Sequence, residues 1–216
     1  MITEYISLAT LFDLDGVILD TEKQYTQFWE DICTRYRLDS EIAGKLKGQT
    51  IEMIFKNYFA NMEKARQEIT TALDKFESEM EMQYIPGLPE FVHGLHVLNI
   101  KSAVVTSSSQ KKMEKVYRKH PELTAMFDRI LTAENFTRSK PAPDCYLLGA
   151  AVLNKNPQNC FVFEDSFNGL KSGRAAGMHV IGLATTNPAD SIRELADIVI
   201  SDFRGTAFET LVSRFY

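Results

Sequence analysis

Long apolar runs are absent from this sequence. No stretch approaches the ~20 consecutive apolar residues that a membrane-spanning helix needs. The opening MITEYISLAT has no basic region followed by a long apolar core, which is the pattern of a secretory leader. We therefore expect a cytoplasmic protein with no membrane partner.

Excess positive charge is lacking as well. The chain has 24 Lys and Arg against 29 Asp and Glu, which gives a formal net charge of -5. Sequence-independent binding of nucleic acid needs a basic face, so we expect no nucleic-acid partner. A small anionic substrate is still compatible with this composition, because local charge can differ from the total.

Cysteine is scarce, and no internal repeat or low-complexity segment is visible. The three residues Cys33, Cys145 and Cys160 are odd in number and show no Cys-x-x-Cys spacing. This pattern favours neither a disulfide framework nor a zinc knuckle. Buried or incidental thiols are expected instead.

The spacing of the apolar residues changes twice along the 216-residue chain. From Tyr25 to Tyr36 they follow the i, i+3, i+4, i+7 pattern of an amphipathic helix, and residues 41–83 continue in this style. The turn signal YIPGLPE follows, and then short β-branched runs alternate with helical patterns. The expected strands are IKSAVVTSSS, NCFVFEDS, HVIGLAT and ADIVISDF, and the helices between them are 110–120, 142–154 and 167–176.

Strands that alternate with helices pair in parallel through right-handed crossovers. The apolar run that opens LFDLDGVILDT is expected to be the first strand. The expected fold class is α/β, a doubly wound parallel sheet, with a small all-helical cap domain inserted after this first strand. We place the catalytic core at residues 1–19 and 85–216 and the helical cap at residues 20–84.

Polar residues follow three of the expected strands at the point where each one ends. Asp13 and Asp15 end the first strand in LFDLDGVILDT, and hydroxyl residues and two further acids end two others. Ligands of open parallel sheets bind at this edge. The residues of the later strand ends are Thr106, Ser107, Ser108, Glu164 and Asp165.

Four carboxylates in one cleft cannot all ionise without positive charge to compensate them. A hard divalent cation with oxygen ligands, held by a few carboxylates and a substrate phosphate, fits this composition, so we expect Mg2+. The loop RSKPAPD adds Lys140, whose following prolines limit local flexibility and can aim the ammonium at the same edge. A nucleophile, a metal, a lysine and a hydroxyl together are what phosphoryl transfer needs.

Four ordered motifs carry a family resemblance. DLDGV with the following DTE, VVTSS, SKPAPD and FEDSFNG resemble the motifs of the haloacid dehalogenase superfamily. The branch is the one that resembles β-phosphoglucomutases and small sugar-phosphate phosphatases. The resemblance covers nearly the whole chain and implies a Rossmann-like core, with the cap where that branch carries it.

The resemblance implies a role for each matching residue. Asp13 is expected to be the nucleophile that forms an aspartyl-phosphate, and Asp15 the general acid and base. Thr106 matches the hydroxyl that binds the phosphoryl group, assisted by the Ser107 amide, with Ser108 beside the substrate. Lys140 matches the lysine that bridges phosphate and nucleophile.

The expected metal-binding residues come from the same motifs. They are Asp13, Asp15, Glu164 and Asp165, with Asp15 contributing its backbone carbonyl. Because Asp15 is present, cleavage of carbon–halogen or carbon–phosphorus bonds is disfavoured, since members with those activities replace this residue.

Comparison with the mutases favours hydrolysis. Thr21 matches a hinge threonine and Lys47 a cap lysine, and both are expected to bind substrate. The mutase's hinge histidine aligns with Tyr25, however, and the cap arginine that grips a second phosphate aligns with Ile51. Loss of a bidentate arginine contact would leave a bisphosphate poorly held.

The motifs also admit simpler structural explanations. Asp13 and Asp15 could be solvated acids in a turn at Gly16, and residues 106–109 could be a helix N-cap. Lys140 and Lys47 could be surface charges, and Glu164 and Asp165 could cap the next helix.

The expected activity is that of a magnesium-dependent phosphatase, with a small phosphorylated metabolite, most simply a sugar phosphate, as its partner. A β-phosphoglucomutase-type isomerase and a non-catalytic phosphate-binding protein are the alternatives. The sequence assigns neither a particular substrate nor an oligomeric state.

Overall fold

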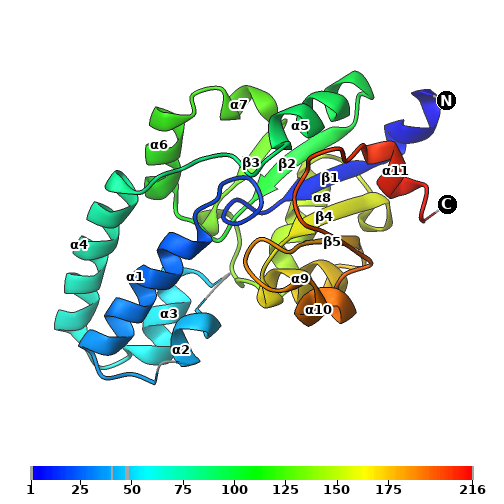
Figure 1. The fold of residues 1–216 in the computed structure, drawn as a ribbon. Helices are drawn as coiled ribbons and strands as arrows, with labels where there is room; N and C mark the ends of the chain where they lie inside the picture. Colours follow the sequence, from blue (N-terminus) through cyan, green and yellow to red (C-terminus); the bar gives the residue numbers. More distant parts are fainter. Residues whose placement is uncertain (1, 40, 47–48, 216) are drawn as a thin grey trace.

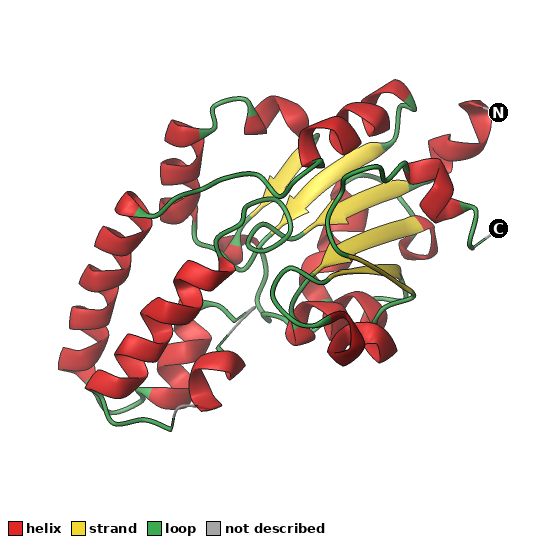
Figure 2. Ribbon diagram, in the orientation of Figure 1, coloured by secondary structure: helices red, strands yellow, loops and turns green. Residues whose placement is uncertain are grey.

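Six parallel strands form the centre of the molecule, in the order β3-β2-β1-β4-β5-β6. The computed structural model describes residues 2–39, 41–46 and 49–215. Helices lie on both faces of the sheet (Figure 2), so the expected doubly wound α/β fold is confirmed. The strands are β1 Ala9–Phe12, β2 Lys101–Val105, β3 Arg129–Leu131, β4 Cys160–Glu164, β5 His179–Leu183 and β6 Ile198–Ile200.

Strand β1 lies in the middle of the sheet, and all four of its residues are buried. It pairs in parallel with β2 on one side and β4 on the other, with Phe12 opposite Val104 and Phe163. Successive side chains point to opposite faces, so Leu11 packs in one apolar cluster and Phe12 in the other. The carboxyl ends of β1, β2 and β4 therefore meet at one edge.

The core helices cover the two faces of the sheet. Phe91 of α5 belongs to the apolar cluster of Phe12, and Tyr146 of α8 belongs to that of Leu11. The core helices are α5 Leu88–Val97, α6 Gln110–Lys119, α7 Leu123–Met126, α8 Asp144–Val152, α9 Phe167–Ala175, α10 Ala189–Ile192 and α11 Phe208–Val212. The short 3-10 turns are η1 Ile2–Ser7, η2 Ala133–Asn135, η3 Pro157–Asn159 and η4 Arg193–Leu195.

One strand was missed by the sequence prediction. The strand β3 has three residues and pairs only with β2, through Ala103–Val105. A strand this short at the sheet edge shows no clear two-residue alternation, which explains the omission. The cysteines behave as expected, since all three are free and buried.

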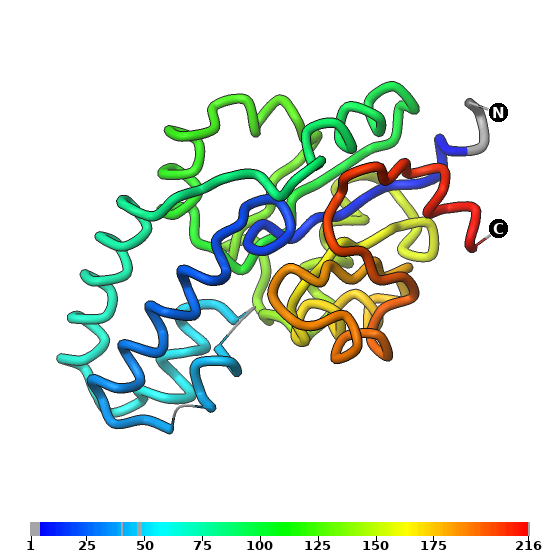
Figure 3. The backbone as a smooth tube through the Cα atoms, viewed as in Figure 1, coloured from blue at the N-terminus to red at the C-terminus, as the bar shows by residue number. Residues whose placement is uncertain are grey.

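Within the residues that the structure describes between β1 and α5, four helices form a separate group with its own apolar centre (Figures 1 and 3). They are α1 Glu22–Arg35, α2 Glu41–Lys45, α3 Ile51–Tyr58 and α4 Glu63–Glu79. The buried residues of this centre run from Trp29 to Ile69. We call these four helices the cap; the domain boundaries assigned from the sequence remain a proposal.

Two chain segments connect the cap to the core, and they pair with each other. The Asp20 amide donates to the Gln83 carbonyl at 2.8 Å, and the Ile85 amide donates to the Ile18 carbonyl at 2.9 Å. These bonds hold the outgoing and returning chain together beside the strand edge. No helix in the described ranges is both long and apolar enough to cross a bilayer.

Candidate active site

Strand β1 ends at Phe12, and the chain then turns so that Asp13 and Asp15 both face a cavity at the strand edge. The Asp13 amide still donates to the Phe163 carbonyl of β4 at 3.1 Å. Gly16 takes a φ of 75°, and its amide donates to the Leu19 carbonyl at 2.7 Å. A Cβ on Gly16 would lie 2.1 Å from Asp165 Oδ2. The turn therefore needs glycine for its backbone and for the space beside Asp165.

Lys140 lies at the centre of the acidic residues and is only 1% exposed. Its ammonium donates to Asp13 Oδ1 at 2.7 Å and to Glu164 Oε1 at 2.6 Å. A third bond of 3.2 Å runs to the Val105 carbonyl at the end of β2. One lysine thus contacts the ends of three neighbouring strands, β1, β2 and β4. Lys140 is therefore not a solvated surface charge, which was the simpler explanation for it.

Burial and neighbouring charges shift the pKa values of this pair. Burial alone would lower the pKa of Lys140, but the charges of Asp13 and Glu164 outweigh it and raise that pKa. Burial raises the pKa of Asp13 to about 7, opposed by Lys140 and assisted by Glu164 and Asp15. The lysine is therefore protonated, and Asp13 is a carboxyl group that more positive charge would help to ionise.

Glu164, at the end of β4, uses both carboxylate oxygens in hydrogen bonds. Besides Lys140, its Oε1 accepts from the Tyr146 hydroxyl at 2.8 Å. Its Oε2 accepts from the Asp165 and Ser166 amides at 3.0 and 3.2 Å and from the Ser166 hydroxyl at 3.1 Å. The carboxylate occupies the space beside Gly169, where a Cβ would lie 1.8 Å from Oε1.

Asp165, unlike Glu164, has a carboxylate oxygen that accepts no hydrogen bond from a described residue. It is 1% exposed, and its Oδ2 has no hydrogen-bond partner among the described residues. Burial, followed by the charges of Glu22 and Glu164, raises the pKa of Asp165 well above its usual value. An unpartnered buried carboxylate oxygen is costly, and a cation beside it would remove that cost.

Asp13, Glu164 and Asp165 form an acidic cluster that can hold a metal ion. One ligand atom from each lies within 4.8 Å of the others. The donors are all oxygens, which suits a hard cation such as Mg2+. Together with the unpartnered Asp165 Oδ2, this donor set fits the expected metal.

Asp15 contacts three groups: one from the segment that leads into the cap, one from the loop after β2 and one from α6. Thr21 donates to Oδ1 at 2.5 Å, and the Ser108 hydroxyl donates to Oδ2 at 3.0 Å. Lys112 of α6 also contacts Oδ2, and its ammonium lies 4.4 Å from the ring centroid of Tyr25.

Lys112 is the main polar residue of the site that sequence reasoning missed. It is only 2% exposed, although lysine is almost never fully buried without a partner. A local signal exists: the Ser109 side chain accepts from the Lys112 amide as the N-cap of α6. The N-cap residue Ser109 fixes where α6 begins. Only the tertiary packing, however, shows that the face of α6 with Lys112 meets Asp15.

The hydroxyl residues after β2 lie at the same edge. Thr106 is 1% exposed, and its hydroxyl accepts from the Ser108 amide at 3.0 Å. Thr106, Ser107 and Ser108 all line the cavity with Asp13. The alternative of a helix cap applies to Ser109, not to Thr106. Ser166, not Glu164 or Asp165, caps α9, because its side chain accepts from the Gly169 amide.

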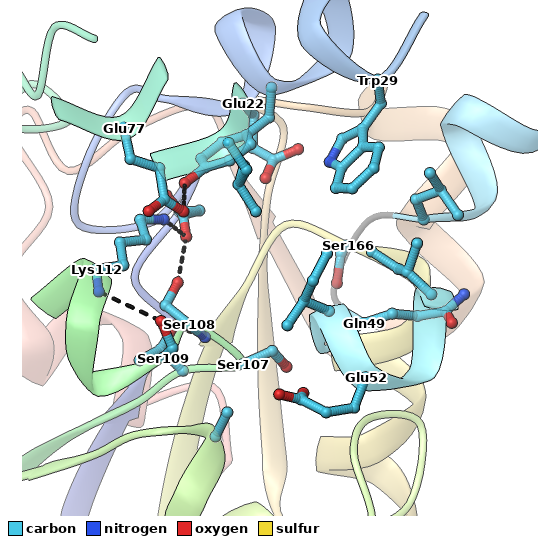
Figure 4. A pocket seen from close by; sticks show the side chains of 18 of the residues that line it. Glu22, Trp29, Gln49, Glu52, Glu77, Ser107, Ser108, Ser109, Lys112 and Ser166 are labelled. Carbon is cyan, nitrogen blue, oxygen red and sulfur yellow. Dashed lines mark hydrogen bonds and ion pairs between the residues drawn. The ribbon is translucent and has the colours of Figure 1, made fainter. Parts of the chain in front are cut away.

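The cavity has a volume of about 380 Å3 and lies between the cap and the strand edge. Figure 4 shows Trp29 and Glu52 of the cap, with Gln49 just before α3, on one side and Ser107, Ser108 and Lys112 of the core on the other. Ile51, which the resemblance aligns with the mutases' cap arginine, lies in its wall. Lys47 lies outside the described residues.

Cap and core are also joined beside the cavity by charged residues of α4 and α6. Lys115 contacts Asp74 Oδ1 at 2.5 Å and Glu77 Oε2 at 3.2 Å. The Tyr25 hydroxyl donates to Glu77 Oε1 at 3.0 Å. Tyr25 of α1 is itself a cap residue: its hydroxyl bonds to Glu77 within the cap, and its ring faces Lys112 of the core.

The sheet order, the cap and this polar edge define a class of hydrolase, and the comparisons identify it. The model of the family described as haloacid dehalogenase-like hydrolase matches residues 10–183. This chain belongs to the haloacid dehalogenase-like hydrolase family, so the expected family and class of enzyme are confirmed.

Among curated proteins, the chain is similar to hexitol phosphatase A of Escherichia coli (strain K12), with 35% identity over 189 residues that cover 85% of each chain. It is 29% identical to a fructose-1-phosphate phosphatase of the same strain, over 79% of this chain and 93% of that one. Among solved structures, a hydrolase of this family from Entamoeba histolytica has a TM-score of 0.81 at 24% identity, covering 95% of this chain and 98% of that one. A β-phosphoglucomutase from Clostridium difficile has a TM-score of 0.78 at 24% identity, covering 96% of both. The structural similarities support the fold.

Proposed function

We propose that this protein is a magnesium-dependent phosphatase that hydrolyses small organic phosphate monoesters, in particular sugar phosphates, through an aspartyl-phosphate on Asp13. The observation that carries the proposal is the buried cluster of Asp13, Glu164 and Asp165, bridged by Lys140. The names of the curated relatives, which include phosphatases of hexitol phosphates and fructose 1-phosphate, support the same class of substrate.

Each residue of the strand edge has a role in this proposal. An oxygen of Asp13 attacks phosphorus, the bond from phosphorus to the leaving oxygen breaks, and Asp15 gives that oxygen its proton. Asp15 then takes a proton from water, the water oxygen attacks phosphorus, and inorganic phosphate leaves as the Asp13 carboxylate is restored. Lys140 neutralises charge on Asp13 and on the phosphoryl oxygens. Thr106 and the Ser107 amide bind a phosphoryl oxygen.

The carboxylates of Asp13 and Asp165 and the backbone carbonyl of Asp15 would hold the metal directly. Magnesium supplies positive charge to the phosphoryl oxygens in this class of reaction. Both oxygens of Glu164 already accept hydrogen bonds, so its main role is to hold Lys140 and the loop after β4. Thr21 and Ser108 orient Asp15, and the predicted contact of Lys47 with substrate remains part of the proposal.

An isomerase that uses a bisphosphate is the second candidate. The apolar Ile51 in the cavity wall and the engagement of Tyr25 with Glu77 count against it, because neither side chain offers a cation to a second phosphate. A protein that only binds phosphate ranks third, since each predicted catalytic residue is present.

The test is release of inorganic phosphate from a panel of sugar phosphates and nucleotides, with magnesium and with a chelator. The proposal expects release that the chelator abolishes. With β-glucose 1-phosphate, formation of glucose 6-phosphate without phosphate release would indicate the isomerase instead.

Asp13→Asn tests the nucleophile. We expect it to abolish turnover while leaving the fold intact, as measured by circular dichroism and thermal unfolding. Asp190→Asn is the control, because the Asp190 side chain is 91% exposed and does not line the cavity. Substantial magnesium-dependent activity in Asp13→Asn would refute the assignment.

A further inference from the structure

Lys112 is a buried cation that the proposed mechanism does not use. Its side chain is 2% exposed and reaches from α6 to the cavity. The ammonium contacts Asp15 Oδ2 and lies 4.4 Å from the centroid of the Tyr25 ring. Burial of an ammonium group is costly unless a carboxylate or an aromatic face compensates it. The contact with the proposed acid and base is therefore the main compensation for this buried charge.

The Asp15 carboxylate receives contacts at both of its oxygens. Thr21 donates to Oδ1, whereas the Ser108 hydroxyl and Lys112 both contact Oδ2. A hydroxyl group rotates and can accept as well as donate, so each hydroxyl fixes the carboxylate only loosely. Lys112 has donors only and carries a full positive charge. It therefore fixes the direction of Oδ2 more strongly than either hydroxyl does.

Glu77, an acid of the cap beside the same tyrosine ring, already has partners at both oxygens. Its Oε1 accepts from the Tyr25 hydroxyl at 3.0 Å, and its Oε2 pairs with Lys115 at 3.2 Å. Lys115 follows Lys112 by three positions in α6, so both lysines lie on one face of the helix. In the view of Figure 4, the Lys112 side chain lies between Glu77 and the loop after β2. The packing therefore leaves Lys112 directed at Asp15.

We infer that Lys112 is a positioning residue of the reaction: its ammonium, backed by the Tyr25 ring, holds the Asp15 carboxylate in place for proton exchange with the leaving oxygen and with water. The inference rests on the proposed phosphatase function and adds a residue to it. A catalytic group that is misplaced by about 1 Å can lose roughly 10²-fold in rate. The loss of Lys112 should therefore have an effect on turnover that is large enough to measure.

Lys112→Met removes the ammonium and keeps a side chain of similar length. With p-nitrophenyl phosphate and magnesium, we expect kcat to fall about tenfold or more and KM to change less than about threefold, because the groups that bind the phosphate are untouched. Arg118→Met is the matched control, since it removes a positive charge from an exposed position of the same helix, outside the cavity lining. A rise in KM with unchanged kcat would make Lys112 a substrate-binding residue and overturn the inference.

A double-mutant cycle with Asp15→Asn tests whether Lys112 acts through Asp15. The single variant Asp15→Asn is expected to accumulate the aspartyl-phosphate, whose decay is followed by rapid quenching and mass spectrometry of the intact protein. Addition of Lys112→Met to this variant should change the decay rate less than about twofold, because two substitutions that disable one group are not additive. If Lys112→Met caused the same tenfold loss without the Asp15 carboxylate, Lys112 would act on another part of the site or on packing alone.

Tyr25→Leu tests the support that the cap gives to Lys112. This variant removes the aromatic face beside the ammonium, so kcat for p-nitrophenyl phosphate is expected to fall about threefold or more, with little change in KM. In the Asp15→Asn variant, the same substitution should leave the decay of the aspartyl-phosphate unchanged within about twofold. A loss that persists there would assign the Tyr25 ring to packing of the cap and contradict its role beside Lys112.

Failure of this inference differs from failure of the proposed function. If the natural protein hydrolyses neither p-nitrophenyl phosphate nor any sugar phosphate with magnesium, the proposed phosphatase function is wrong. If it hydrolyses them and Lys112→Met keeps kcat within about twofold, only the role of Lys112 is wrong. Circular dichroism and thermal unfolding check the fold of each variant. Lys112→Gln, which keeps a polar side chain, replaces Lys112→Met if the methionine variant does not fold, and the same kcat and KM criteria decide.

Discussion

Lys140 Nζ lies 2.7 Å from Asp13 Oδ1, although the two residues are 127 positions apart in the chain. The same ammonium contacts Glu164 Oε1 at 2.6 Å. Removal of a buried cation between two carboxylates leaves their charges uncompensated, which is more costly than loss of the contact itself.

Lys140→Met is therefore expected to lower both activity and stability. The free energy of unfolding should fall by about 3–5 kcal/mol, and kcat should fall by about 10²-fold or more. Urea unfolding and phosphate release measure the two effects. Lys171→Met, at an exposed position of α9, is the control. A variant at Lys140 with native stability would contradict the interpretation of this lysine as the charge that balances the cluster.

Asp15→Asn separates the two halves of the proposed reaction. We expect slow turnover and accumulation of an aspartyl-phosphate, because the amide cannot take a proton from the attacking water. Rapid quenching after addition of substrate, followed by mass spectrometry of the intact protein, would detect the added phosphoryl group. Unchanged turnover would remove Asp15 from the mechanism.

Gly16→Ala tests the space beside the acidic cluster. Gly16 and Gly177 both have positive φ values, 75° and 70°, but a Cβ at Gly177 meets nothing within 4 Å. Gly177→Ala should cost only the left-handed backbone penalty of about 1–2 kcal/mol. Gly16→Ala should cost more and should also raise the magnesium concentration needed for half-maximal activity, since its Cβ would displace Asp165 Oδ2.

Thermal unfolding and a magnesium titration of both variants provide the comparison. If Gly16→Ala behaved like Gly177→Ala in both measurements, the close approach to Asp165 would have no functional consequence.

Asp128 gives a prediction for the dependence of stability on pH. Burial by itself raises its pKa, but the hydrogen bonds from Lys101 at 2.6 Å and from the Ser102 amide at 2.9 Å outweigh burial and lower it overall. A carboxyl whose pKa is lower in the folded state stabilises the fold above its unfolded value of about 3.9, and this contribution disappears as the pH falls through the folded value.

Asp128→Asn should therefore reduce the free energy of unfolding at neutral pH by about 1 kcal/mol, since Lys101 is exposed and screened. The difference from the natural protein should shrink as the pH falls below about 4. Urea unfolding across this range measures it, with Asp190→Asn as the exposed control. A difference that is constant with pH would show that the charge of Asp128 contributes nothing.

The fold class and much of the candidate site could be predicted from the sequence because both depend on local patterns. Alternating strand and helix patterns indicated a parallel sheet, and a parallel sheet brings the residues after β1, β2 and β4 to one edge. This is why Asp13, Thr106 and Asp165 could be expected to meet. The short strand β3 was not predicted, because a strand of three residues shows too little hydrophobic periodicity to be recognised.

Other parts of the site depended on packing between distant segments. Lys112 belongs to a helix whose polar pattern is ordinary, and its contact with Asp15 follows from the packing of α6 beside the loop after β1. Tyr146 reads as a core residue of α8, yet its hydroxyl donates to Glu164. No local pattern encodes which side chain a buried group will meet across the core.

The sequence by itself determined the order of the strands along the chain, the cap insertion and the kinds of chemical group at the strand edge, since periodicity and residue type are local properties. Only the tertiary structure decided how these groups are paired. It left Asp165 Oδ2 without a hydrogen-bond partner among the described residues while both oxygens of Glu164 are engaged. The difference between these two carboxylates arises because only the packed fold brings their partner groups, from distant segments of the chain, within hydrogen-bond distance.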